Sequence, residues 1–338
     1  MITLDSDHLE VRFPAVHPDA RMAFNLQRTL RVPDSDEVYP LPPGLGRFPL
    51  RHIEDFSDRV PEAWSRRGGV IFPMYQAEAM WINFETRFDL DYPCAVKIGT
   101  GKINAVSGKP WSTELVDDPQ DYVVLPGQPW LDGYASSDGI VRQFVAMPLG
   151  SGLTVEQHLS GKEEHGGIQI FIYPMKAERY RKLLAERQRR QDGFVRYCLA
   201  EPLVCHAVAP MGLAAGGRIR QEVYRDEYGV DAWDMEHARR CFVTILNSEG
   251  WSEVTGEPVP TTPVSAEDYA RAGLPWFDHY NENLKPISGS ALFRKLPSLP
   301  GMKRIREWKG VIHPTKMPVV EVGPSVRPSA RRVNEGDF

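Results

Sequence analysis

The segment AVKIGTGKINAV (residues 95–106) predicts a β-hairpin. Two arms rich in Val, Ile and Ala flank Gly99-Thr100-Gly101, and glycine tolerates the positive φ that a tight hairpin loop requires. Further short runs with strand character, separated by Gly- and Pro-bearing turns, lie on both sides of this segment. They are residues 9–13, 24–32, 69–75, 80–84, 122–125, 140–147, 167–173, 217–224 and 241–246. This spacing predicts stacked antiparallel sheets.

The composition agrees with a globular chain built from many short elements. The 338 residues include 28 Gly and 29 Pro, which favours turns over a helical bundle. With 40 Lys and Arg against 45 Asp and Glu, the net charge of −5 gives no strong field toward nucleic acid or a membrane surface. The N-terminus lacks a signal-peptide pattern, and the longest uncharged stretch, residues 202–217, contains Pro and Gly. We therefore expect a cytoplasmic protein without a membrane span.

The predicted fold is α+β and β-rich, with packed antiparallel sheets in a sandwich-like arrangement, a charged helix and a helical C-terminal region. The charged helix is expected at residues 175–191, where Ala177, Tyr180, Leu183 and Leu184 form an apolar stripe. A capping box at Ser265 and Asp268 predicts a second helix start. We expect the chain to divide into four regions: a lead-in at 1–23, a β-rich core at 24–250, a helical, aromatic region packed on the core at 251–317, and an extended tail at 318–338.

An arginine-bearing sheet face is the first candidate binding surface. Period-two alternation places Arg218 and Arg220 on one face of a strand, and Arg142 lies within another strand. Guanidinium groups on one surface suit a carboxylate, a phosphate or a protein partner. The alternative is that these arginines form cross-strand ion pairs with Glu222 or Glu114.

Loop aromatics are the second candidate. Trp130 and Asp132 share one loop, a composition suited to recognition of a sugar or a protein surface, although Trp130 as a core residue is the competing interpretation. From these two features we expect a non-enzymatic binding or scaffold protein. Its partner would be a protein or a small polar ligand, without a cofactor and without nucleic acid.

A metal-assisted, hydrolase-like enzyme is the first alternative. His158, Glu164 and His165 lie in two short clusters of imidazoles and carboxylates seven residues apart, which could meet across a turn around a divalent metal. No recognised ligand spacing such as HExxH is present.

Oxygen donors suited to calcium also lie close together in two loops, at Asp117, Asp118 and Asp121 and at Asp132 and Asp138, without the spacing of an EF-hand.

Self-assembly is the second alternative. Aromatic residues at 275–280 and the C-terminal tail would bury against a neighbouring copy and form a homo-oligomer.

Several blocks of sequence resemble a known family. They are RTLRVPD (28–34), PPGLG (42–46), FPMYQAEAMWINF (72–84), AVKIGTGKINAVSG (95–108) and RQFVAMPLGSG (142–152). The chain resembles a group of uncharacterised bacterial and fungal proteins that share these blocks in this order, over roughly residues 24–285. Some longer fungal relatives carry the label of integral membrane protein. The resemblance therefore assigns no catalytic residue to this chain.

Overall fold

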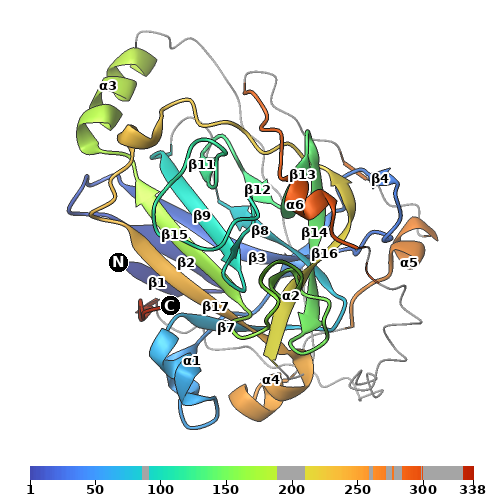
Figure 1. Cartoon of the computed structure of the whole chain (residues 1–338). Coiled ribbons are helices and arrows are strands. Elements are labelled where there is room, and N and C mark those ends of the chain that lie inside the picture. Colours follow the sequence, from blue (N-terminus) through green and yellow to red (C-terminus); the bar gives the residue numbers. More distant parts are fainter. Residues whose placement is uncertain are drawn as a thin grey trace.

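The computed structural model of the chain describes residues 1–85, 91–188, 210–258, 262–271, 276–277, 284–297, 299 and 330–338. These residues are rich in strands, and most strands pair antiparallel within one large sheet (Figure 1). The prediction of a β-rich α+β protein is therefore confirmed at this level. No helix within the described ranges is long and apolar enough to cross a membrane.

The described sheet has 18 strands. They are β1 (Ile2–Asp5), β2 (His8–Arg12), β3 (Arg21–Thr29), β4 (Val38–Tyr39), β5 (Gly44–Arg47), β6 (Arg51–His52), β7 (Val70–Met74), β8 (Ala79–Phe84), β9 (Cys94–Thr100), β10 (Ile103–Asn104), β11 (Val123–Leu125), β12 (Trp130–Leu131), β13 (Gly133–Ser137), β14 (Ile140–Pro148), β15 (Ile168–Pro174), β16 (Pro210–Arg220), β17 (Arg239–Asn247) and β18 (Arg331–Arg332). The α-helices are α1 (Glu62–Arg67), α2 (Val155–Ser160), α3 (Ala177–Gln188), α4 (Ser248–Thr255), α5 (Ala266–Arg271) and α6 (Ala291–Arg294).

Two runs of antiparallel strands meet at one corner of the sheet. The first run has the order β1-β2-β3-β8-β14-β16, and the second has the order β17-β15-β9-β11. Strand β16 joins the runs, because Pro210 and Met211 at its start pair with Leu246 and Ile245 of β17. Two parallel pairs extend this frame, β7 beside β17 and β4 beside β16.

One apolar core contains side chains from both runs. Leu26 and Ile82 come from the first run and Ile98 and Ile170 from the second, and each is at most 1% exposed. Strands β9 and β15 are buried along their whole length. Such continuous burial is typical of strands covered on both faces, and it makes β9 a rigid base for the loops that follow it.

The predicted hairpin at 95–106 forms between β9 and β10, but its turn lies further along the chain than expected. Thr100 pairs with Ile103, so Gly101 and Lys102 form a two-residue loop, with φ of 55° and 58°. Positive φ at both loop residues matches the right-handed twist of the strands. Gly99 remains in β9, where a Cβ would lie 2.5 Å from the ring of Trp111, so close approach of this indole requires glycine there.

Both chain ends join the sheet. Residues 1–23, expected as a lead-in, supply β1 and β2, and β18 near the C-terminus pairs with β1 (Figure 1). Val333 is fully buried, and Phe338 stacks edge-on against Phe171 and Phe242. The described part of the tail, residues 330–338, therefore packs on the chain's own sheet.

Helix α3 has the apolar stripe, and helix α5 has the N-terminal cap, that the sequence predicts. Tyr180 of α3 stacks on Tyr92 at 4.1 Å between ring centroids, and Leu183 and Leu184 also pack on the core, as the apolar stripe predicted. At the start of α5, the Ser265 hydroxyl accepts the backbone N–H of Asp268 at 3.0 Å, which confirms the capping box. Pro275 and Tyr280 of the expected aromatic cluster lie outside the described residues, whereas Phe277 is 48% exposed.

Candidate functional site

Arg142 does not lie on a solvated sheet face. It is 5% exposed and covered by the segment that follows α6. Each of its five guanidinium N–H donors has a backbone carbonyl as acceptor. The acceptors are Gly216 at 3.1 Å for Nε, Phe293 at 3.4 Å and Leu296 at 2.7 Å for Nη1, and Ala215 at 2.9 Å and Pro297 at 3.1 Å for Nη2. Arg142 therefore ties residues 293–297 to β16, and no donor remains for a partner.

The other two arginines lie apart from this buried group. Arg218 is the cross-strand neighbour of Arg142, but its guanidinium reaches Asp36 at 3.1 Å on the surface. Arg220 is exposed at the end of β16. The expected surface of three arginines is therefore divided into one buried, one ion-paired and one exposed side chain.

Trp130 and Asp132 do come together, and Asp132 lies in the interior. Asp132 is 2% exposed, and its carboxylate accepts the amide N–H of Gln221 at 2.7 Å. Burial raises the pKa of Asp132 to about 7, while hydrogen bonds from Trp130 and Gln221 oppose this rise. Trp130 is half-buried and packs edge-on against Trp81, with 5.6 Å between ring centroids. This placement makes Asp132 part of an enclosed polar contact.

The residues expected to bind a metal have other roles. Glu156 at the start of α2 accepts the backbone N–H groups of residues 164–166 at 2.8–2.9 Å, so its carboxylate organises that loop. Glu164 is exposed, and partial burial lowers the pKa of both His158 and His165. Within the described ranges, no group of three or more His, Cys, Asp and Glu side chains is placed to hold a metal ion.

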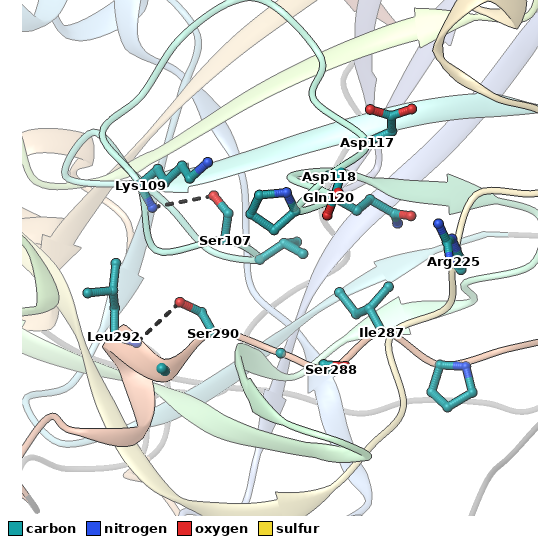
Figure 2. A pocket seen from close by; sticks show the side chains of 15 residues that line it. Ser107, Lys109, Asp117, Asp118, Gln120, Arg225, Ile287, Ser288, Ser290 and Leu292 are labelled. Carbon is teal, nitrogen blue, oxygen red and sulfur yellow. Dashed lines mark hydrogen bonds between the residues drawn. The ribbon is translucent and has the colours of Figure 1, made fainter.

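A pocket of about 460 Å³ lies where three segments of the chain meet (Figure 2). Its volume is within the ~300–1,000 Å³ typical of small-molecule sites. It is lined by Val106, Ser107, Lys109, Asp117, Asp118, Pro119, Gln120, Arg225, Pro286, Ile287, Ser288, Gly289, Ser290, Ala291 and Leu292. None of the residues selected for the binding surface from the sequence belongs to this lining.

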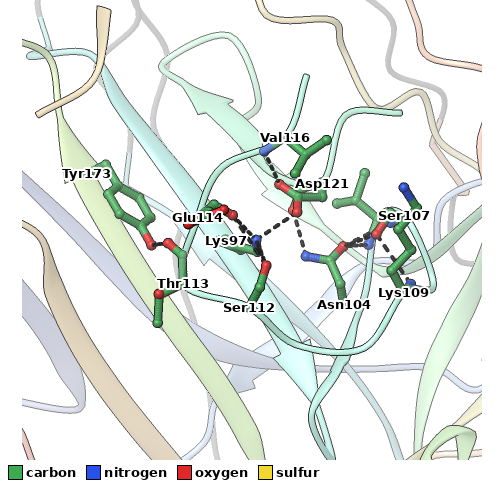
Figure 3. A network of polar contacts seen from close by, with 11 residues as sticks. Lys97, Asn104, Ser107, Lys109, Ser112, Thr113, Glu114, Val116, Asp121 and Tyr173 are labelled. Carbon is green, nitrogen blue, oxygen red and sulfur yellow. Dashed lines mark hydrogen bonds and ion pairs between the residues drawn. The ribbon is translucent and has the colours of Figure 1, made fainter. Parts of the chain in front are cut away.

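The first wall is the turn after β10, and Asn104 holds it in place. The Asn104 side-chain oxygen accepts the backbone N–H groups of Val106 and Ser107, both at 2.9 Å, and the Ser107 hydroxyl at 3.2 Å (Figure 3). The Ser107 hydroxyl in turn accepts the backbone N–H of Lys109 at 3.3 Å. One buried amide therefore sets the backbone from residue 104 to residue 109.

The second wall is the loop at residues 112–121, and Lys97 holds it. Lys97 is fully buried on β9, and its ammonium group donates to Asp121 at 2.7 Å, to the Ser112 hydroxyl at 3.0 Å and to the Glu114 carbonyl (Figure 3). The Asn104 amide donates to the Asp121 carbonyl at 2.7 Å. The two loops are thus joined by one buried polar network, and their positions are not independent.

The third wall contains Arg225 and residues 286–292. Gln120 donates to the Tyr224 carbonyl at 2.9 Å and accepts the Asp226 N–H at 2.7 Å, so it clamps the backbone on both sides of Arg225. Three backbone hydrogen bonds fix the remainder of this wall: Arg225 to Lys285 at 2.7 Å, Ile287 to Val223 at 2.8 Å and Ser290 to Ala135 at 2.7 Å. Hydrogen bonds within the protein therefore hold the backbone of all three walls in place.

The chemistry of the lining is that of a binding pocket. It presents charged groups, serine hydroxyls and an apolar patch, but no His or Cys among its described residues. The sequence did contain one signal for this site, since Lys97 interrupts an apolar strand and a buried lysine requires a partner. Its partner, Asp121, is 24 residues further along the chain, and local pattern does not specify such a pairing.

The chain matches no family model, no curated protein and no solved structure. The resemblance to bacterial and fungal proteins therefore stays a prediction.

Proposed function

We propose that this chain is a non-enzymatic binding protein that holds a small polar ligand in the pocket between residues 106–120, Arg225 and residues 286–292. The observation that carries the proposal is the polar network beneath the pocket. Two buried side chains, Lys97 and Asn104, fix the two loops that form its first two walls. A pocket whose walls are held before binding loses little conformational freedom when a ligand enters.

A binding role agrees with the groups that face the pocket. Asp117 and Asp118 are exposed, and the Ser107 hydroxyl already bonds to Asn104 and to the Lys109 backbone. The described lining has no imidazole or thiol to activate such a hydroxyl. The binding role expected from the sequence is kept, and its site moves from the arginine-bearing strands to this pocket.

The proposal includes the sandwich-like packing of the two strand runs and the helical C-terminal region. A single apolar core to which both runs contribute supports the packing. Support for the C-terminal region comes from α6, which packs on β13 through Phe293 against Tyr134 at 4.8 Å between ring centroids. In this arrangement α6 and the residues before it supply one wall of the pocket.

A thermal-shift screen tests the binding role. The wild-type chain, Ser288→Trp and Ser288→Ala are heated with a set of amino acids, dipeptides, organic acids, amines, sugars and inorganic phosphate. Ser288→Trp adds a large side chain at the pocket lining to obstruct the ligand, and Ser288→Ala is the matched control. A true ligand at 100 times its Kd adds about 2.7 kcal/mol of stability, which raises the Tm of wild type and Ser288→Ala by about 4 °C and leaves Ser288→Trp unshifted. If no compound raises the Tm, or Ser288→Trp shifts equally, the proposed site is wrong.

A further inference from the structure

The pocket carries charges of both signs that the surrounding protein does not neutralise. Lys109 and Arg225 are cationic, and Asp117 and Asp118 are anionic. All four side chains are exposed, and none forms an ion pair within 4.0 Å with another residue of the described part of the chain. Elsewhere, arginines such as Arg51 are ion-paired.

The four charges are spread around the pocket. Figure 2 shows Lys109 and Arg225 at opposite ends of it, with Asp118 between them. They sum to zero, so a ligand with one charge would be attracted by one pair and repelled by the other. A ligand with two opposite charges meets complementary charge at both of its ends, which is the arrangement that gives specificity.

The lining also has an apolar part. Ile287 and Leu292 contribute aliphatic side chains, and Leu292 is 44% exposed. The volume of about 460 Å³ exceeds what a single inorganic ion occupies and suits a molecule of several carbon atoms. A ligand with an aliphatic side chain and two charged ends would use every part of this lining.

We infer that the ligand is a zwitterion of dipeptide size, whose carboxylate is bound by Lys109 or Arg225 and whose ammonium group is bound by Asp117 and Asp118. This inference rests on the proposed binding function and names its ligand class. Both charges are needed together, because each end of the ligand enters a part of the pocket that has the opposite charge.

Calorimetric titration of four forms of one compound tests this inference. Glycyl-leucine, its N-acetyl form, its C-terminal amide and the doubly blocked form share one side chain and differ in which terminal charges they keep. The free dipeptide is expected to bind most tightly, and removal of either charge is expected to weaken binding about tenfold, as for loss of one charge-assisted hydrogen bond.

Protein variants assign the two ends. Asp118→Asn should weaken binding of the free dipeptide but leave the N-acetyl form unaffected, because that form has no ammonium group to lose a partner. Lys109→Met or Arg225→Met, whichever removes the cation that binds the carboxylate, should weaken the free dipeptide and spare the C-terminal amide, and if neither variant does so the assignment of the carboxylate is wrong. Asp138→Asn is the control, since this exposed carboxylate lies outside the pocket lining.

The outcomes separate the inference from the function it rests on. Equal affinity for all four forms would overturn the zwitterion and leave the binding pocket in place. The same holds if no dipeptide form binds, while a compound of another class binds and is lost in Ser288→Trp. If no dipeptide form and no compound of the wider set binds, the inference and the proposed function both fall.

Discussion

Lys97 and Asp121 form a buried ion pair, with 2.7 Å between the ammonium nitrogen and a carboxylate oxygen. Their side chains are 1% and 7% exposed. Removing two charges from water is costly, so such a pair contributes little net stability compared with an apolar pair. It does fix geometry, because the other hydrogen bonds of the ammonium and carboxylate groups go to Ser112, Glu114 and Val116 of the loop at 112–121. We regard the pair as the element that sets the shape of the pocket.

Lys97→Met is expected to destabilise the fold strongly. The substitution leaves Asp121 buried without its counter-charge, a change that costs about 3–5 kcal/mol in other proteins. Urea denaturation measures the loss in free energy of unfolding. Lys97→Met combined with Asp121→Asn should recover part of this loss, since no charge then remains buried. A loss below about 1 kcal/mol in the single variant would mean that the pair is not enclosed.

Asn104→Ala is expected to loosen the first wall of the pocket. Its side chain accepts three hydrogen bonds from residues 106–107 and donates one to Asp121, and these buried groups would lose their partner. A destabilisation of about 2–4 kcal/mol follows from the unpaired groups, with weaker binding of any pocket ligand. Asn334→Ala, at an exposed position outside the lining, is the control for urea denaturation and titration. Equal effects of the two variants would contradict the role of Asn104.

Asp132 is expected to make stability fall as pH rises. Its folded pKa of about 7 lies above the usual value of 3.8, so between these values the folded state binds more protons than the unfolded state. The free energy of unfolding therefore loses on the order of 4 kcal/mol from about pH 4 to about pH 7 through this group.

Asp132→Asn should remove that dependence, as seen in the difference between variant and wild-type denaturation curves measured across this pH range. Asp138→Asn is the exposed control. A variant whose stability changes with pH as the wild type does would show that Asp132 is already ionised in the folded state at pH 4.

Arg142→Ala is expected to lower stability by about 3 kcal/mol or more, because five backbone carbonyls lose their donor. Arg220→Ala, on the same pair of strands but exposed, should stay within about 0.5 kcal/mol of wild type. Differential scanning calorimetry distinguishes the two variants. An unchanged Tm for Arg142→Ala would return this residue to the candidates for partner binding.

The sequence predicted local elements well, because periodicity and turn chemistry act over a few residues. The hairpin at β9 and β10, the stripe of α3 and the cap at Ser265 are all present. The exact turn was missed because Gly99 serves close approach of Trp111, and the positive φ falls instead on Gly101 and Lys102. A glycine in the sequence does not reveal whether it is required for a positive φ or for the close approach of another side chain.

The site was not predictable in the same way. Strand alternation places Arg142 on the correct face, but it does not say that residues 293–297, about 150 positions away, cover that face. Likewise, Lys109 and Arg225 belong to one pocket only because Gln120 clamps the backbone beside Arg225. Such contacts depend on tertiary packing, which local pattern does not contain.

The most direct test of a ligand pocket is a crystal structure of the chain grown with the compound that gives the largest thermal shift. We predict electron density for the compound between the turn at 106–109, the loop at 117–120 and residues 286–292, with charged ends near Lys109 or Arg225 and near Asp118. Density for the compound elsewhere on the chain, or an empty pocket at saturating concentration, would contradict the proposed function.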